Sequence, residues 1–316
     1  MSSPVVREEL RIVTRQLVVG AFSPSVLLRV SRRLGLLEQR GLDVREDSVP
    51  SSPAQCRALL AGDLDAALTS PDNVIAYRFV PDNPLGETAD VKIVAAVDRG
   101  LGLGVYGRPG LTSAADLKGA NIGVDVPGSG FAFALYALLE SLGLGRDDYH
   151  VVTLGSTPRR LEALLAGDCD ATMLNAGNEL RAEDAGAARL AGLAEVCHPY
   201  LGTVLSTVGD HRRADVEALA GALREAARTI AGGDADDAVV EEAAEALRLP
   251  DALAARYLDR LKDPAEGLVV DGTIDLDAME TVVNLRRTYM PALVGGVDVL
   301  ATALDPSRGL IDPYGR

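Results

Sequence analysis

The same run of apolar and polar positions occurs twice along the chain. Residues 58–66 read Ala-Leu-Leu-Ala-Gly-Asp-Leu-Asp-Ala, and residues 163–171 differ from them only by Cys169 in place of Leu64. In each copy an Ala/Leu run ends at a glycine, and a short apolar run follows Asp-x-Asp. This pattern predicts a helix closed by a glycine, a tight turn and a buried strand. Two similar α/β units are therefore expected.

A small polar loop follows each of these two predicted strands. The loops are Thr69-Ser-Pro-Asp-Asn73 and Asn175-Ala-Gly-Asn-Glu179. Two copies are too few for a solenoid of repeats. Because ligands of open α/β sheets bind beyond the carboxyl ends of strands, both loops are expected beside a ligand site.

The same periodicities predict the other elements. The apolar run 91–97 is typical of a central parallel strand. Near the N-terminus we expect a strand at 10–14, a loop at 16–23 and a helix from about Pro24 to Arg40. Later we expect a short strand near 194–197, a strand at 203–208, and then mostly helices, at 214–230, 237–247, 250–261 and 276–285.

Length and composition limit the class of protein. The 316 residues favour two domains, and 47% hydrophobic with 24% charged residues is typical of a globular chain. Trp is absent and aromatic residues are scarce, so the core is expected to be built from Ala, Leu and Val. The net charge of −15 argues against nucleic acid or an anionic membrane as the main partner.

Cysteines and histidines predict no metal centre. Cys56, Cys169 and Cys197 have no CxxC spacing, which excludes a disulfide framework and a zinc site. Cys56 and Cys169 are interpreted as buried, inert thiols. No metal and no cofactor are therefore expected. The histidines, whose spacing fits no metal motif, are His150, His198 and His211.

The N-terminal residues carry no export signal that can be recognised. No charged segment precedes an apolar run of about 7–15 residues, and no lipoprotein cysteine is near the start. No uninterrupted apolar stretch of about 18 residues occurs anywhere, so no membrane span is expected. The expected localisation is cytoplasmic, or periplasmic or extracellular if the N-terminus is truncated.

Several motifs in this order resemble a known family. They are Gly-Leu-Leu-Glu-Gln-Arg-Gly-Leu-Asp-Val (35–44), Leu-Ala-Gly-Asp-Leu-Asp-Ala (60–66), the strand at 91–97, Thr112 to Val124, and the second Leu-Ala-Gly-Asp-x-Asp-Ala. The chain looks like the type 2 periplasmic substrate-binding-protein fold. Its outline is similar to the branch of sulfonate, nitrate and taurine binding proteins and thiamine-pyrimidine-synthase-like proteins. The resemblance covers roughly residues 10–210.

The resemblance implies a two-lobed α/β fold with a helical C-terminal extension. One lobe comprises residues 1–98 plus 204–316, and the other comprises 99–203. A small polar or anionic organic ligand would bind in the cleft between them, as in the binding proteins of ABC transporters, and an ABC permease would be a partner if the protein is exported. The loops implied to hold the ligand give the candidates Gln16, Phe22, Ser23, Thr69, Ser70, Asp72, Asn73, Arg99, Asp125, Gly128, Ser129, Gly130, Phe131, Asn175 and Asn178.

The chemistry of these candidates leaves alternatives open. The Gly128-Ser-Gly-Phe131 stretch at a helix start favours an anion, or is simply a capped helix. Ser70 either caps the helix opened by Pro71 or faces the ligand. His198 either lines the cleft or is a packed or surface residue. Cations near the predicted loops, each a partner for a carboxylate or sulfonate or else a structural residue, are Arg15, Arg99 and Arg181.

The alternative function is an enzyme on the same fold. The related desulfinases carry a nucleophilic cysteine in the first loop, where this chain reads Gly20-Ala-Phe-Ser-Pro24, and the Cys-rich motif of the pyrimidine synthases is absent. Neither activity is therefore expected of this chain. What remains is a cytoplasmic, cofactor-independent lyase or hydrolase for a small carboxylated substrate, aromatic or not, or a ligand sensor. The candidate acid–base residues are Asp72, Asp125, Glu179 and His198.

Overall fold

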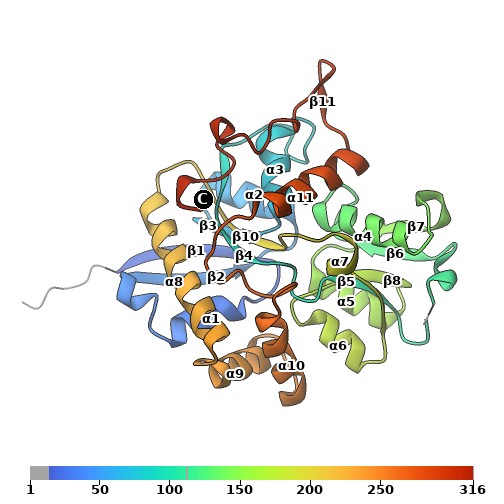
Figure 1. The fold of residues 1–316 in the computed structure, drawn as a ribbon, viewed down its shortest axis with the longest axis horizontal. Helices are drawn as coiled ribbons and strands as arrows, with labels where there is room; N and C mark the ends of the chain where they lie inside the picture. The colour runs from blue at the N-terminus through green and yellow to red at the C-terminus, as the bar shows by residue number, and fades with distance from the viewer. Residues whose placement is uncertain (1–13, 112, 316) are drawn as a thin grey trace, which may run out of the picture.

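The strands of the chain form two separate five-stranded sheets. A computed structural model of the protein describes residues 14–111 and 113–315. Within these residues the strands pair as two five-stranded sheets and one two-stranded hairpin. Figure 1 shows the first sheet, with its blue strands β1 and β2, on the left and the second, mostly green, on the right. The strand predicted at 10–14 lies almost entirely outside the described residues.

The first sheet has the strand order β2-β1-β3-β10-β4. β1 pairs in parallel with β2 along its whole length and with β3, whereas β10 runs antiparallel to both β3 and β4. The strands are β1 (Arg15–Ala21), β2 (Leu42–Ser48), β3 (Ala66–Thr69), β4 (Val91–Asp98) and β10 (Thr203–Val208).

The second sheet has the order β7-β6-β8-β5-β9 and repeats this design. β6 pairs in parallel with β7 and β8, and β5 runs antiparallel to β8 and β9. The strands are β5 (Gly104–Gly107), β6 (Asn121–Val124), β7 (His150–Thr153), β8 (Ala171–Leu174) and β9 (Ala188–Gly192). The proposed lobe boundaries at 98/99 and 203/204 stay a prediction.

The duplicated sequence forms the same structure twice, as predicted. Helices α2 and α5 end at Gly62 and Gly167, whose φ angles are 78° and 81°. In both copies the next aspartate N–H bonds back into the helix, at 2.9 Å. The strands that follow, β3 and β8, lie at the centre of their sheets. A left-handed glycine therefore turns each helix into a buried strand.

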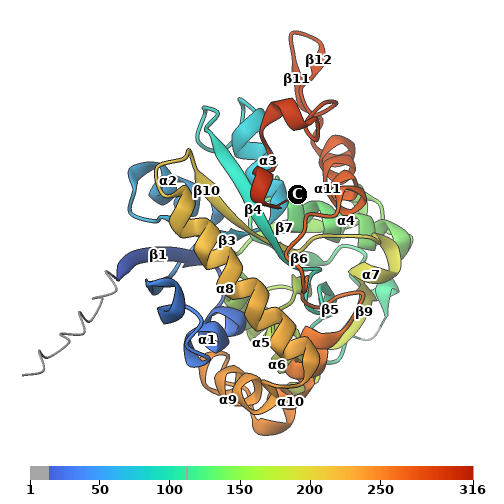
Figure 2. The same cartoon turned by 60° about the vertical axis from the view of Figure 1, so that its left-hand side comes forward.

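Helices cover both sheets and continue into a C-terminal extension. Near the C-terminus a short hairpin of β11 (Leu293–Val294) and β12 (Val297–Asp298) projects from the molecule (Figures 1 and 2). The helices are α1 (Val26–Arg33), α2 (Ser52–Ala61), α3 (Pro71–Phe79), α4 (Gly130–Ser141), α5 (Thr157–Ala166), α6 (Asn178–Asp184), α7 (Leu193–Val196), α8 (Arg213–Gly232), α9 (Asp236–Ala246), α10 (Asp251–Lys262) and α11 (Leu276–Tyr289).

The C-terminal extension contacts elements of both sheets. α10 packs against α8 and α9, but also against α6 beside the second sheet. α11 packs against both α3 and α4, and Figure 2 shows it beside both. One hydrophobic core runs without a break through α3, α4 and α11. The extension therefore holds the two sheets together on two sides.

Four expectations about the elements are wrong. The segment expected to be a loop at 16–23 is mostly β1, because its apolar side chains pair and bury it beside β2. α1 ends at Arg33 because Gly35 adopts a φ of 71°. Residues 193–196 form a helical turn, and the strand precedes it as β9. β4 is an antiparallel edge strand, buried because the C-terminal segment pairs with it at Ile93.

Candidate functional site

A large pocket lies between the two sheets, where the carboxyl ends of their parallel strands face each other. The space between its walls is about 930 Å³, including open solvent at its mouth. Its polar lining side chains are Ser23, Ser25, Thr69, Ser70, Asn73, Asp98, Asp125, Ser129, Ser156, Thr157, Arg160, Asn175, Thr203 and Tyr257.

The first wall comes from the ends of β1 and β3. Phe22 and Ser23 follow β1, and Ser25 caps α1 by accepting a hydrogen bond from the N–H of Leu28 at 3.2 Å. Ser70 caps α3 by accepting from the N–H of Asp72 at 3.3 Å. A serine hydroxyl group therefore caps each of two helix N-termini on this wall.

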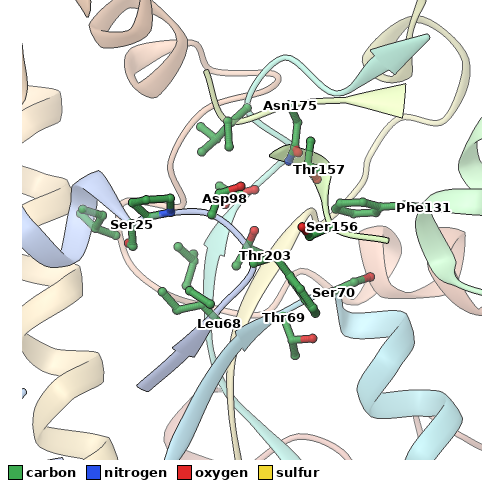
Figure 3. A pocket seen from close by; sticks show the side chains of 18 of the residues that line it. Ser25, Leu68, Thr69, Ser70, Asp98, Phe131, Ser156, Thr157, Asn175 and Thr203 are labelled. Atoms are coloured by element: carbon green, nitrogen blue, oxygen red, sulfur yellow. The ribbon is translucent and has the colours of Figure 1, made fainter. Parts of the chain in front are cut away.

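The second wall comes from β6, β8 and the starts of α4 and α5. Ser129 caps α4 by accepting from the N–H of Ala132 at 3.1 Å, and its hydroxyl donates to the carboxylate of Asp125. Burial is the main cause that raises the pKa of Asp125. Figure 3 shows Phe131 pointing into the pocket from this side, with Ser25 opposite and Asp98 between them in this view.

Asp98 lies where the chain passes between the sheets. Its Oδ1 accepts a hydrogen bond from the backbone N–H of Gly100 at 2.8 Å. Thr203 is its partner residue in the β4–β10 pair. Burial, only partly offset by its hydrogen bonds, raises the pKa of Asp98 to about 6. A Cβ on Gly202 would lie 2.5 Å from Asp98 Oδ1, so the close crossing of the two segments requires glycine there.

The C-terminal extension closes one side of the pocket. Tyr257 and Leu261 of α10 and Leu268 after it all line the space and are buried. Sequence reasoning missed these residues, because no local motif links α10 to the loops of the two sheets.

Many of the sequence-predicted ligand residues do line this pocket. Whether they bind a ligand stays a prediction, but their location is fixed by the fold. Those that line the space are Phe22, Ser23, Thr69, Ser70, Asn73, Asp125, Ser129, Gly130, Phe131 and Asn175.

Asp72 lies outside the pocket, contrary to expectation. Its side chain is 0% exposed, and both carboxylate oxygens accept hydrogen bonds from Arg286, at 2.6 and 2.7 Å. Gly128 is also outside, and its carbonyl accepts from the same arginine at 3.1 Å. Asp72 and Gly128 therefore contact Arg286 next to the pocket wall and do not line the pocket.

Four other predicted ligand or acid–base residues also lie away from it. Gln16 is at the opposite end of β1, where its carbonyl accepts from Arg212. The guanidinium of Arg99 donates to the carbonyl of Leu268 at 2.8 Å. Asn178 donates back to the carbonyl of Asn175 at 3.0 Å. His198 is exposed and lines no part of the pocket.

Glu179 is buried behind the pocket. Its Oε2 accepts from the N–H of Gly177 at 2.7 Å, and Oε1 has no hydrogen-bond partner among the described residues. Burial raises the pKa of Glu179 to about 7. Glu179 does not line the pocket, so this position does not support the expected acid–base role.

The arginine that does line the pocket is Arg160. The sequence suggested Arg15, Arg99 and Arg181 instead, because these lie near predicted loops, whereas Arg160 lies one turn inside the repeat helix α5. Its position after Ser156 and Thr157 at a helix start was the available signal.

The cysteines show no reactive environment. Cys56, Cys169 and Cys197 are free and buried, and burial raises the pKa of Cys56 to about 12 and of Cys169 to about 11. In the described part of the chain, no three His, Cys, Asp or Glu side chains are placed to hold a metal ion. None of its helices is long and apolar enough to cross a membrane.

Comparisons with known proteins agree with this architecture. A family model described as NMT1/THI5 like matches residues 26–231. No curated protein matches the sequence significantly.

Three solved structures illustrate the likeness of fold. The alkanesulfonate-binding protein SsuA from Xanthomonas axonopodis pv. citri, bound to MOPS, is 21% identical with a TM-score of 0.71, over 91% of this chain and 97% of that one. The periplasmic nitrate-binding protein NrtA from Synechocystis PCC 6803 is 12% identical with a TM-score of 0.69, over 90% and 84%. The desulfurization enzyme DSZB is 18% identical with a TM-score of 0.60, over 92% and 99%.

These likenesses, together with the two sheets, show the expected fold class. It is a two-lobed α/β fold of the type 2 periplasmic-binding-protein kind, with a helical C-terminal extension. The expectation of a cytoplasmic protein gains no support from them, since the nitrate-binding neighbour is named as periplasmic.

Proposed function

The chain belongs to the NMT1/THI5-like family, and from this premise we propose that it binds a small polar or anionic organic molecule in the pocket between its two sheets. One observation carries the proposal. Hydroxyl, amide and charged side chains from both sheets converge on one cavity, at the strand ends where α/β sheets bind ligands.

The distribution of the lining residues supports capture by closure of two lobes. Ser70 and Asn73 come from the first sheet, whereas Ser129 and Asn175 come from the second. A ligand that bonds to both sides stabilises the closed arrangement by its differential affinity for it. Such a binding protein would work outside the cytoplasm and deliver its ligand to an ABC-type permease.

The test is a thermal-shift screen of the purified chain. Carboxylates, sulfonates, purines, pyrimidines and aromatic acids are added singly, and each hit is titrated by calorimetry. A ligand present at about 100 times its Kd adds about 2.7 kcal/mol to the free energy of unfolding. Saturable binding that Asn175→Ala and Asn73→Ala weaken supports the proposal. A broad panel without one saturable ligand would overturn it.

A cofactor-independent enzyme is the second candidate function, and Asp98 is the observation that favours it. This carboxyl group lines the pocket and has a pKa raised to about 6, which suits a general acid or base near neutral pH. Mass spectrometry of each hit after incubation separates the two functions. A compound recovered unchanged favours binding, and one converted by the wild type but not by Asp98→Asn favours catalysis.

A further inference from the structure

Arg160 is a buried cation whose guanidinium is held by neutral protein acceptors. Its side chain is 2% exposed. Among the residues that the structure describes, Arg286 is the other buried arginine, and it pairs with Asp72. No carboxylate forms an ion pair with Arg160 in that part of the chain, although Asp125 is near enough to influence its charge. Buried charges in proteins are usually paired directly, whereas Asp125, itself bonded to Ser129, compensates Arg160 without direct contact.

Hydrogen bonds to acceptors of the protein occupy four of the five N–H groups of the Arg160 guanidinium. Nε and Nη2 donate to the carbonyl of Met173 at 3.3 and 3.1 Å, Nη2 also donates to Thr157 Oγ1 at 3.0 Å, and Nη1 donates to the carbonyl of Gly155 at 2.6 Å. An arginine has five N–H groups, and four bonds leave one Nη1–H without an acceptor among the described residues. These bonds fix the guanidinium in the pocket wall.

The helix that carries Arg160 also differs from the other helices that begin at the pocket. The start of α1 has Glu46, whose carboxylate accepts from the N–H of Ser25 at 2.7 Å. The start of α3 has Asp72 in its first turn, and the start of α4 has Asp125 bonded to its cap Ser129. Each of these helix starts therefore already has a carboxylate beside it.

The start of α5 has no such charge. Its first turn contains no acidic residue, and its N-cap, Ser156, makes no side-chain cap hydrogen bond. Ser156 and Thr157 both line the pocket beside Arg160. The positive end of this helix dipole and the arginine therefore act at the same place on the wall.

We propose that the ligand carries one anionic group, a carboxylate or a sulfonate, that pairs with Arg160 at the N-terminus of α5. This inference rests on the proposed binding function and narrows its ligand class. Asp98 and Asp125 line the same pocket and oppose a second negative charge. The site therefore selects monoanions.

The experiment compares anions with their neutral amides. Calorimetric titration uses benzoate, benzenesulfonate, nicotinate, 4-aminobenzoate, propionate and ethanesulfonate, each with its amide, and phthalate as a dianion. Wild type is compared with Arg160→Gln and with Arg160→Lys, which keeps the charge but loses the planar fork. Arg159→Gln is the matched control, because Arg159 is the adjacent, exposed arginine of the same helix.

The expected result is that monoanions bind, their amides and phthalate do not, and Arg160→Gln weakens binding at least about 30-fold. Arg160→Lys should be intermediate, and Arg159→Gln should change the Kd less than about threefold. If the Arg160 variants have a much lower melting temperature than the wild type, the comparison of each anion with its amide in the wild type still tests the inference. Amides that bind as well as their anions would overturn this inference and leave the binding function intact. Absence of any binding, here and in the broad panel, would overturn both.

Discussion

Arg286 and Asp72 form a bidentate ion pair that joins α11 to the first turn of α3. Their side chains are only 3% and 0% exposed. The same guanidinium donates to the carbonyl of Gly128 and lies over the ring of Phe133, 4.9 Å from its centroid. One arginine of the C-terminal extension thus holds the starts of α3 and α4, which line opposite walls of the pocket, in a fixed relation.

Removing this arginine should destabilise the protein strongly. Arg286→Met leaves the carboxylate of Asp72 buried and unpaired, so the free energy of unfolding should fall by about 3–5 kcal/mol in urea titration. The double variant Asp72→Asn with Arg286→Met should recover part of the loss, because the uncompensated charge is gone.

An exposed ion pair serves as the control for this prediction. Arg45 and Asp47 have side chains 69% and 39% exposed, and Arg45→Met should change the free energy of unfolding by less than about 1 kcal/mol. Equal small effects at Arg45 and Arg286 would contradict the stabilising role of the buried pair.

Gly130 allows α3 and α4 to approach each other, and a larger residue should separate them. A Cβ at this position would lie 2.4 Å from the Cβ of Asp72. Gly130→Ala should therefore lower the free energy of unfolding by about 1–3 kcal/mol and weaken ligand binding. Gly232→Ala is the control, since the nearest atom there is 3.6 Å away, and its effect should stay below about 1 kcal/mol. A neutral Gly130→Ala would show that the two helices can shift apart freely.

Two serines at the pocket should respond differently to alanine. Ser129 caps α4 and bonds to Asp125, so Ser129→Ala should lower the free energy of unfolding by about 0.5–2 kcal/mol without any ligand. Ser156 makes no cap bond, so Ser156→Ala should leave stability within about 0.5 kcal/mol and reduce only ligand affinity. Thermal melting with and without ligand measures both, and a stability loss at Ser156 would assign it a capping role after all.

The buried carboxyl group of Glu179 should make stability depend on pH. Its folded pKa of about 7 lies above its ordinary value of 4.5, so the folded state binds a proton that the unfolded chain releases. The free energy of unfolding should therefore rise as the pH falls from about 7 to 4.5. Glu179→Gln should reduce this slope in urea titrations, whereas the exposed Glu162→Gln should not. An unchanged slope in Glu179→Gln would contradict the assignment.

Sequence reasoning succeeded where the determinants are local. Gly62 and Gly167 end their helices by their own left-handed conformation, so the repeated units could be predicted from a few adjacent residues. The pocket loops at the ends of β3 and β8 follow from the same units.

It failed where the partner is distant along the chain. Asp72 has the sequence context of a ligand residue, but its partner Arg286 is 214 positions away and occupies both carboxylate oxygens. Arg160 was missed although its acceptors Gly155 and Met173 are only 5 and 13 positions away, because an ordinary helix context does not show that they hold it in the pocket wall. Tyr257 likewise reaches the pocket only through the packing of α10.

The position of Arg286 near the end of the chain affects the order in which the molecule can be assembled. The five strands of each main sheet all precede α11, but Asp72 lacks its ion-pair partner until residue 286 is in place. We expect contacts over so long a separation to form late, because the loop-closure cost is paid before the contact stabilises the chain. The native arrangement of the pocket walls is therefore expected to be a late event in folding, after each sheet has formed.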